Sequence, residues 1–497
     1  MNIRINQLSE PKLEFGNGVK GIDPKPALTA GGPFASDSIR EIQLGLVCFA
    51  EEEYWIRSWI ERMHNLISSE ETNAKRFIQF PGLDKAFRSR FTIPNRFVRY
   101  IDRNRYARLI AQRDHRAFEE LLELIAQPVH SLFGDDRPAC VLVGFSEELA
   151  TLRVSNPRLS YQEQQFLQRI QRDDEANQLQ LFDPSEDEKR FAAELIPQSE
   201  ELLFRNFHRA LKAKCMGLPN PVPLQVVRRQ TYMSDEAKQS DATRAWNLAV
   251  AIYYKAGNIP WRPADLTKST CFVGLSFHHL KRRSGDLVYA SLAQAFSTDV
   301  EPFTLKGASV PHDQTINKRP YLTAAQAASL TEDVLRNYSD RAGGLPSRIV
   351  IHKTSRYQPD EQKGFRDTAL SSVGACDLAW LNPTGFRLLR RGMKEPARGT
   401  LCTIADDNHY LFTTGYVEWW GEYPGPHIPS PVQVGSPFKT DIEERSREIL
   451  ALTKMNWNSA DGLGRNPITI SFARRVGMIM TELDEDAPPN PLFRFYM

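Results

Sequence analysis

Apolar runs of strand length alternate with amphipathic segments of helix length in the first half of the chain, and this alternation constrains the fold most. Residues 42–50 (IQLGLVCFA) and 140–146 (CVLVGFS) predict buried strands, and residues 51–67 (EEEYWIRSWIERMHNLI) predict an amphipathic helix. Helices are also expected at 201–217 and 240–257, and a strand that runs out into a loop at 223–232. Strands that alternate with helices favour a parallel sheet covered by helices.

The pattern changes after GNIPWRP at 257–263, which places the main boundary of the chain near residues 257–266. Beyond it, strands of a mixed sheet are expected in four runs: CFVGLSF (271–277), LVYASLAQAF (287–296), RIVIHKTS (348–355) and LCTIADDNHYLFTTGY (401–416). Helices at 323–338 and 467–482 would flank this sheet. Residues 1–37 are rich in Gly and Pro and predict a strand followed by an irregular arm.

Composition excludes several classes of protein. The 497 residues are 41% hydrophobic and contain no apolar run of about eighteen residues, so no membrane partner is expected. The N-terminal sequence lacks an apolar signal core, which favours a cytoplasmic protein. The cysteines are far apart and predict reduced thiols rather than a zinc site: Cys48, Cys140, Cys215, Cys271, Cys376 and Cys402.

Charge is unevenly distributed although the formal net charge is only +2. Residues 88–116, 281–283 and 387–398 are basic, whereas residues 171–190 are acidic and polar. A basic stretch is usually a solvated face. Arginine interleaved with aromatic residues at 88–116 makes contact with phosphate or with a partner an equally good interpretation.

Four polar residues of the first half form an ordered set. His208 and Lys212 are four residues apart on one predicted helix, so they share a face. Gln225 lies on the next predicted strand, and Lys255 ends the following helix. Each residue alone is more typical of a surface or a helix end. Together, near a helix end, they indicate a site for a terminal phosphate.

Ser276 is a single small hydroxyl within the apolar run CFVGLSF. A core serine bonded to the main chain is the ordinary interpretation. The alternative is that Ser276 occupies a position that once carried a different, functional side chain.

The ordered set, together with LEFGNG, AGNIPWRP, HYLFTTGY, MNWNS and NPITISFARRV, resembles the short prokaryotic Argonautes, which consist of MID and PIWI domains. The resemblance implies an α/β protein with a Rossmann-like MID domain followed by a ribonuclease H-like PIWI domain. Residues 1–37 would be an arm that completes the PIWI sheet, with LEFGNG as the part that resembles it. Residues 38–257 would be the MID domain, and residues 258–497 the PIWI domain.

The same resemblance implies a role for each residue of the set. His208, Lys212, Gln225 and Lys255 match the MID pocket that binds the 5′-phosphate of a guide strand, with His208 where the family often has tyrosine. The C-terminal carboxylate of Met497 and the amide of Gln225 would hold Mg²⁺ against guide phosphates, because hard cations prefer oxygen ligands.

The resemblance also implies that the PIWI domain is catalytically inactive. Argonautes that cut their targets hold two metal ions with carboxylates. Ser276, Thr354 and Arg474 align with three of those ligand positions, and none of them can replace a carboxylate. The fourth position, a glutamate on a mobile loop, is not assigned.

The implied function is a guide-loaded sensor. A 5′-phosphorylated guide RNA would pair with a single-stranded DNA target and activate a partner with an APAZ region and a sirtuin-like, TIR or nuclease effector, in defence against plasmids or phage. One alternative is a guided nuclease with relocated carboxylates, such as Asp406 or Asp407. Another is a scaffold that binds no nucleic acid.

Overall fold

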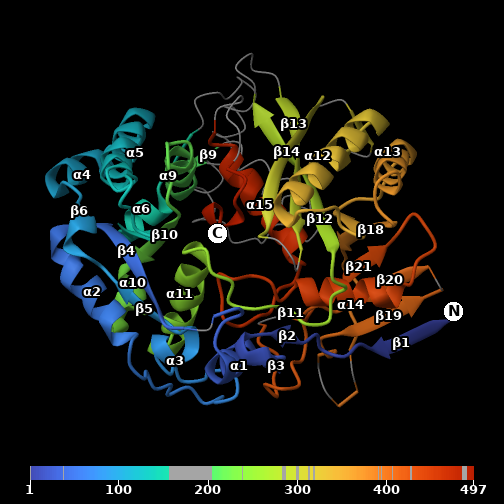
Figure 1. The fold of residues 1–497 in the computed structure, drawn as a ribbon, viewed down its shortest axis with the longest axis horizontal. Coiled ribbons are helices and arrows are strands. Elements are labelled where there is room, and N and C mark those ends of the chain that lie inside the picture. Colours follow the sequence, from blue (N-terminus) through green and yellow to red (C-terminus); the bar gives the residue numbers. More distant parts are fainter. Residues whose placement is uncertain are drawn as a thin grey trace, which may run out of the picture.

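The computed structural model describes residues 2–497 apart from 37, 156–203, 238, 282–286, 298–300, 312–313, 317–318, 390, 393–394, 406, 426–427 and 484–489. The acidic stretch at 171–190, Asp406 and most of the basic turn at 281–283 therefore lie outside the described residues. Figure 1 shows two α/β halves side by side, with the C-terminal residues between them.

The first half is built on a parallel sheet, as the alternating pattern predicts. Its strands run in the order β10-β7-β4-β5, and β6 also pairs with β4. The strands are β4 (Arg40–Cys48), β5 (Ser89–Thr92), β6 (Val98–Tyr100), β7 (Cys140–Phe145) and β10 (Leu224–Arg228). The main helices are α2 (Glu53–Arg62), α3 (Leu83–Phe87), α4 (Arg103–Ile110), α5 (His115–His130), α6 (Glu147–Thr151), α9 (Phe207–Met216), α10 (Arg229–Tyr232) and α11 (Asp241–Lys255).

Both faces of this sheet are covered by helices. Leu46 of β4 belongs to a core shared with Trp246 of α11, whereas the adjacent Val47 belongs to a core with Leu121 of α5 and Phe207 of α9. Successive side chains of a strand point to opposite faces, so β4 joins both cores.

Two predicted elements of this half are wrong in part. The helix expected at 201–217 begins only at Phe207, because residues Phe204–Asn206 form β9, which pairs with β8 (Arg153–Ser155). The side chain of Asn206 accepts a hydrogen bond from the Arg209 N–H and starts the helix there. The strand within 223–232 ends at Arg228, but α10 follows it where a loop is expected.

The second half contains a nine-stranded mixed sheet in the order β1-β19-β20-β21-β18-β17-β12-β13-β14. Strands β12, β17 and β18 are parallel, and the other pairs are antiparallel. The bounds are β1 (Ile3–Gln7), β12 (Thr270–Lys281), β13 (Leu287–Phe296), β14 (Phe303–Pro311), β17 (Arg348–Lys353), β18 (Ala375–Pro383), β19 (Thr400–Ile404), β20 (Asn408–Leu411) and β21 (Val432–Gly435).

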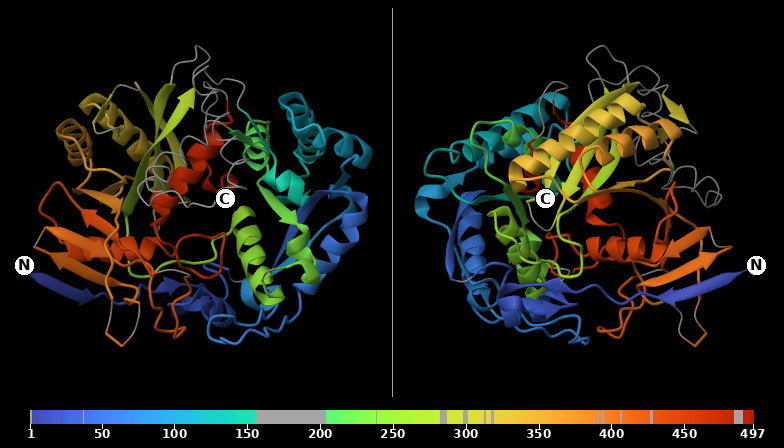
Figure 2. Two further views of the ribbon diagram at one scale, coloured as in Figure 1. Left: turned by 180° about the vertical axis from the view of Figure 1, so that it is seen from behind. Right: turned by 45° about the vertical axis from the view of Figure 1, so that its right-hand side comes forward.

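Helices cover this sheet on both faces (Figures 1 and 2). Val273 of β12 packs in a core with Leu330 of α12 and Phe365 of α13, whereas the adjacent Phe272 shares a core with Phe472 of α15. The helices are α12 (Ala324–Ala342), α13 (Pro359–Leu370), α14 (Ile442–Leu452) and α15 (Ile468–Met480). The second half therefore has the helix-covered mixed sheet that the sequence predicts.

The N-terminal residues join the second half rather than the parallel sheet. Strand β1 pairs with β19, while LEFGNG supplies β2 (Leu13–Glu14), which pairs with β3 (Lys20–Gly21) and β11 (Arg262–Pro263) in a small sheet. The strand added to the large sheet is thus Ile3–Gln7 and not LEFGNG. The domain boundaries stay a prediction.

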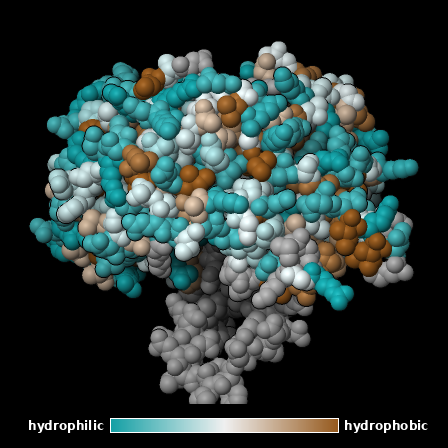
Figure 3. Space-filling model, turned by 90° about the horizontal axis from the view of Figure 1, so that it is seen from below, coloured by the Kyte–Doolittle hydropathy of each residue, from teal (hydrophilic) through white to brown (hydrophobic). Residues whose placement is uncertain are grey.

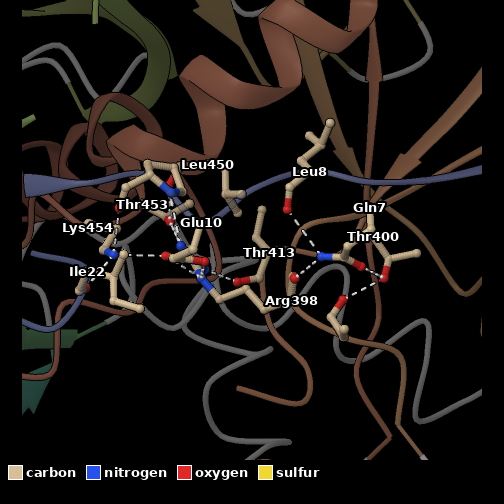
Figure 4. A network of polar contacts seen from close by, with 12 residues as sticks. Gln7, Leu8, Glu10, Ile22, Arg398, Thr400, Thr413, Leu450, Thr453 and Lys454 are labelled. Atoms are coloured by element: carbon tan, nitrogen blue, oxygen red, sulfur yellow. Dashed lines mark hydrogen bonds and ion pairs between the residues drawn. The ribbon is translucent and has the colours of Figure 1, made fainter. Parts of the chain in front are cut away.

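A buried polar network fixes this arm (Figure 4). Glu10 forms ion pairs with Arg398 at 3.0 Å and with Lys454 at 2.9 Å. Both cationic residues are buried. Lys454 also donates to the main-chain oxygen of Ile22, so one ammonium group links two parts of the arm.

All six cysteines are free thiols, and five of them are buried. No helix within the described ranges is long and apolar enough to cross a membrane. Figure 3 shows a face on which hydrophilic side chains predominate and hydrophobic ones form only small groups.

Candidate functional site

A pocket of about 520 Å³ lies where α9, β10 and α11 meet α15 and the C-terminal residues. It contains all four residues of the predicted phosphate site and also Met497. The lining residues are Phe145, Ala150, Asn206, His208, Arg209, Lys212, Gln225, Val226, Arg228, Lys255, Asn458, Arg475, Met478, Ile479, Tyr496 and Met497. The structure therefore brings together residues from both halves of the chain.

Regular secondary structure positions the four predicted residues. His208 and Lys212 lie one turn apart in α9, whose start is capped by Asn206. Gln225 is the second residue of β10, and Lys255 is the last residue of α11. A site built on helices and a strand holds its side chains more precisely than a site on loops.

The two lysines are held by oxygens of the protein itself. Lys212 Nζ donates to the main-chain oxygen of Met497 at 2.5 Å, and Lys255 Nζ donates to Gln225 Oε1 at 2.5 Å. The amide nitrogen of Gln225 donates to the Val226 oxygen at 2.9 Å. Each ammonium group thus has an oxygen partner, and the partner of Lys255 is the neutral amide oxygen of Gln225.

The charged side chains of the pocket are all positive. Its lining includes no Asp or Glu side chain among the residues that the structure describes. Its cationic side chains are Arg209, Lys212, Arg228, Lys255 and Arg475, and in the described part of the chain only Lys212 donates to an oxygen of Met497. A cavity whose side-chain charges have one sign concentrates ligands of the opposite sign, so this pocket favours an anion.

Burial makes these charges costly in the absence of a ligand. Lys212 is 6% and Lys255 3% exposed. Burial, and then the positive charge of Lys255, lower the pKa of Lys212 well below its ordinary value, and burial lowers the pKa of Lys255 to about 8. Burial, Lys212 and Lys255 likewise lower the pKa of His208. An anion bound here would oppose all three shifts.

Sequence reasoning missed several basic residues of the pocket. Arg209 follows His208 directly, and its Nη1 atom is buried without a hydrogen-bond partner in the described part of the chain. A buried donor without an acceptor is costly and indicates a missing ligand or water. The doublet at 474–475 was a visible signal for Arg475, but its place in the pocket depends on how α15 packs.

Helix α15 packs directly onto the strand that carries Ser276. A Cβ atom added to Gly274 would lie 1.8 Å from the main-chain oxygen of Thr469, so only glycine permits this approach. His352 of the neighbouring strand contacts the same helix, with its Nδ1 atom 2.9 Å from Thr469 Oγ1. This contact fixes the start of α15, which carries both Arg474 and Arg475 further along.

The structure places two of the three residues predicted to replace catalytic carboxylates beside each other. Leu275 and Lys353 are register partners on the parallel strands β12 and β17, so Ser276 and Thr354 occupy the next position on each chain. Ser276 is half-buried and Thr354 is exposed. Arg474 lies on α15, and the structure describes its main chain but not its side chain.

The described residues contain no group of three or more His, Cys, Asp or Glu side chains placed to hold a metal ion. The carboxylate of Glu361 accepts from Lys353, the residue before Thr354, at 2.5 Å, and from the N–H groups of Leu322 and Gln358.

The rival carboxylate Asp407 lies in the turn between β19 and β20. Three strands lie between β20 and β12, so the two strands are four inter-strand spacings apart. At about 4.8 Å per spacing this distance is roughly 19 Å. A metal site at Asp407 would therefore not include Ser276.

No family model and no curated protein sequence matches the chain. Among solved structures, it is similar to Clostridium butyricum Argonaute bound to a guide DNA and a 19-mer target DNA (TM-score 0.61, 16% identity, 99% of this chain and 55% of that one). It is also similar to Aa-Ago with externally bound siRNA (TM-score 0.57, 15% identity, 99% and 56%) and to Drosophila Piwi (TM-score 0.55, 14% identity, 99% and 56%).

The chain spans just over half the length of these solved proteins. At this level of identity the similarity concerns the fold, and the fold-class prediction is confirmed. A parallel sheet is followed by a large mixed sheet, and the solved Argonaute structures cover nearly the whole chain. The protein therefore has the α/β fold of the MID and PIWI half of Argonaute proteins.

Proposed function

We propose that the protein binds a 5′-phosphorylated guide RNA in this pocket and uses it to recognise complementary single-stranded DNA. One observation carries the proposal. Within the described part of the chain, the pocket combines two buried lysines with a buried arginine donor that has no partner, and no side-chain carboxylate lines it. The solved neighbours that hold guide DNA, target DNA or siRNA support a nucleic acid as the ligand.

A terminal phosphate suits the geometry of the pocket. It offers several oxygens and up to two negative charges, and it could accept from Lys212, Lys255 and Arg209 together. On binding, Lys255 would exchange the neutral oxygen of Gln225 for a charged one. His208 lies at the pocket wall, 6.1 Å from the ring of Phe145, where it can contact the first nucleotide.

The predicted magnesium site uses oxygens that this pocket does provide. Gln225 Oε1 and the main-chain oxygen of Met497 are hard donors of the kind that Mg²⁺ prefers. Both now accept from lysines, so they become available only when Lys212 and Lys255 turn to another acceptor. Gln225 and Met497 could therefore bind Mg²⁺ only when guide phosphates are also bound. The ion would then neutralise part of the phosphate charge.

We further propose that the protein is a sensor without nuclease activity. Ser276 and Thr354 follow the register pair Leu275 and Lys353 on two neighbouring strands. The proposal is supported by the fact that neither side chain is a carboxylate. The output would then come from an APAZ-containing effector with a sirtuin-like, TIR or nuclease domain, in defence against plasmids or phage.

The test begins with purified protein. Its bound nucleic acids are extracted and sequenced, and the 5′ ends are checked for phosphate. Guides with a 5′-phosphate or a 5′-hydroxyl are then compared in binding, and a complementary DNA target is added with Mg²⁺ or Mn²⁺. Preference for the phosphate, with an intact target, supports the proposal. Equal binding of both guides contradicts the pocket, and sequence-directed cutting contradicts the sensor.

A further inference from the structure

Strand β1 is an open edge of the large sheet. In the described part of the chain it pairs only with β19, and Figures 1 and 2 show it at the periphery of the molecule. Its side chains are exposed, including Ile3 at 52% and Ile5 at 55%. Proteins usually protect such edges, because unpaired main-chain groups bind other strands.

The register shift and the proline that interrupt the opposite edge of the sheet are missing from β1. Its five-residue register with β19 is regular, without a bulge, and it contains no proline. At the opposite edge the β13–β14 pairing contains a register shift, and β14 ends at Pro311. Each edge strand carries one charged residue, Arg4 in β1 and Lys306 in β14.

The hydrogen bonds of β1 show which residues face outward. The main-chain oxygen of Asn2 and the N–H of Leu8 both bond to the neighbouring strand at 2.9 Å. In an antiparallel pair the direction of the main-chain groups alternates from residue to residue, so the N–H and C=O groups of the even-numbered residues point toward β19. The N–H and C=O groups of Ile3, Ile5 and Gln7 therefore point to the open edge.

This edge is complementary to itself. A twofold axis through Ile5 brings Ile5 opposite Ile5 of a second copy, Ile3 opposite Gln7 and Arg4 opposite Asn6. The main-chain groups of the odd-numbered residues point to the open edge, so the pair Ile5–Ile5 and the two pairs Ile3–Gln7 can exchange about six main-chain hydrogen bonds. An axis through Arg4 would instead place two arginines opposite each other, which is unfavourable.

We propose that β1 pairs antiparallel with β1 of a second copy of this chain, centred on Ile5, so that the two large sheets become continuous. The exposed isoleucines of both copies would then lie on one face of the joined sheet and contact each other. A strand of five residues alone buries less than the roughly 1,200 Å² of a stable interface, so the dimer is expected to be reversible. This association does not depend on the phosphate pocket.

The first test measures the mass of the full chain by sedimentation equilibrium over about a hundredfold range of concentration. The weight-average mass should rise toward that of a dimer. Ile5→Lys should abolish the rise, because it places two ammonium groups opposite each other. Leu345→Lys, at a residue that is 47% exposed and outside the edge, should leave it unchanged. Binding of 5′-phosphorylated guides should be the same in all three proteins.

The second test fixes the register. In the proposed pair, Arg4 lies directly opposite Asn6, so the variant with Arg4→Cys and Asn6→Cys should form a covalent dimer under mild oxidation. Arg4→Cys alone should not. A mass that stays monomeric, self-association that survives Ile5→Lys, or covalent dimers of Arg4→Cys alone would overturn the proposal. A further outcome is that the chain stays monomeric and that a protein which co-purifies with it is absent from the Ile5→Lys variant. In that case the edge binds a strand of another protein, and the proposal is wrong.

Discussion

Replacement of Lys255 by methionine tests the proposed guide binding, because it isolates the contribution of one buried charge. Methionine keeps an unbranched apolar side chain in the space that Lys255 fills at the end of α11, and it removes only the ammonium group. Burial lowers the pKa of Lys255 only to about 8, so the ammonium form still predominates at pH 7 and its charge is available to the ligand.

A charge-assisted hydrogen bond contributes roughly 1.5–3 kcal/mol. Loss of Lys255 also removes its repulsion of Lys212, which offsets part of that contribution. We therefore expect the lower part of the range, about 1.5–2 kcal/mol, or roughly tenfold to thirtyfold weaker binding of a 5′-phosphorylated guide. Binding of a 5′-hydroxyl guide should change little.

The assay is fluorescence anisotropy with the two guides at one salt concentration, because phosphate contacts depend strongly on salt. Lys214→Met is the matched control. Lys214 lies on α9, pairs with Glu123 at 2.5 Å and is not part of the pocket, so its loss changes the net charge equally. If Lys255→Met weakens both guides to the same extent, or acts no more strongly than Lys214→Met, the phosphate is not bound at Lys255.

Three further predictions concern pH, the N-terminal arm and the Ser276 site. Affinity for a 5′-phosphorylated guide should fall by up to about tenfold per pH unit above pH 8, measured by anisotropy, because free Lys255 loses its proton there and binding must restore it. Glu10→Gln should lower the free energy of unfolding by about 3 kcal/mol, measured by urea denaturation, because Arg398 and Lys454 stay buried without their anion. Burial raises the pKa of Glu10, but Arg398 and Lys454 lower it by more, so the net pKa is below its ordinary value of 4.5. The stability that Glu10 contributes is therefore present above pH 4.5 and is lost as the pH falls through the lower pKa of the folded state. Ser276→Asp should leave a paired DNA target intact on a denaturing gel with Mg²⁺ or Mn²⁺, since one carboxylate cannot hold two metal ions; cutting by this variant would refute the argument.

The sequence predicts elements best where apolar runs are long. The expected strands at 42–50 and 140–146 coincide closely with β4 and β7, because few alternatives can bury such runs. The segment 201–217 was harder, since its apolar residues continue across a strand and a helix. Only the cap formed by Asn206 separates the two, and capping is a local geometry that a periodic pattern does not reveal.

The candidate site shows the same division. Helical spacing alone predicts that His208 and Lys212 share a face, and both line the pocket. The presence of Arg475 could not be predicted in this way. It reaches the pocket because α15 lies against β12 at Gly274, a tertiary contact between segments far apart in the chain.

The buried oxygen of Met497 has a consequence for the order in which the protein becomes functional. Lys212 has this oxygen as a partner, and Tyr496 and Met497 form part of the pocket wall. Met497 lies 285 residues after Lys212 in the chain. The parallel sheet of the first half can therefore form before these residues are in place, whereas the pocket has its full wall only once Tyr496 and Met497 have packed beside α9. Under the proposed function, guide binding would thus be a late step of folding, and a chain cut before residue 496 would not compete for guides.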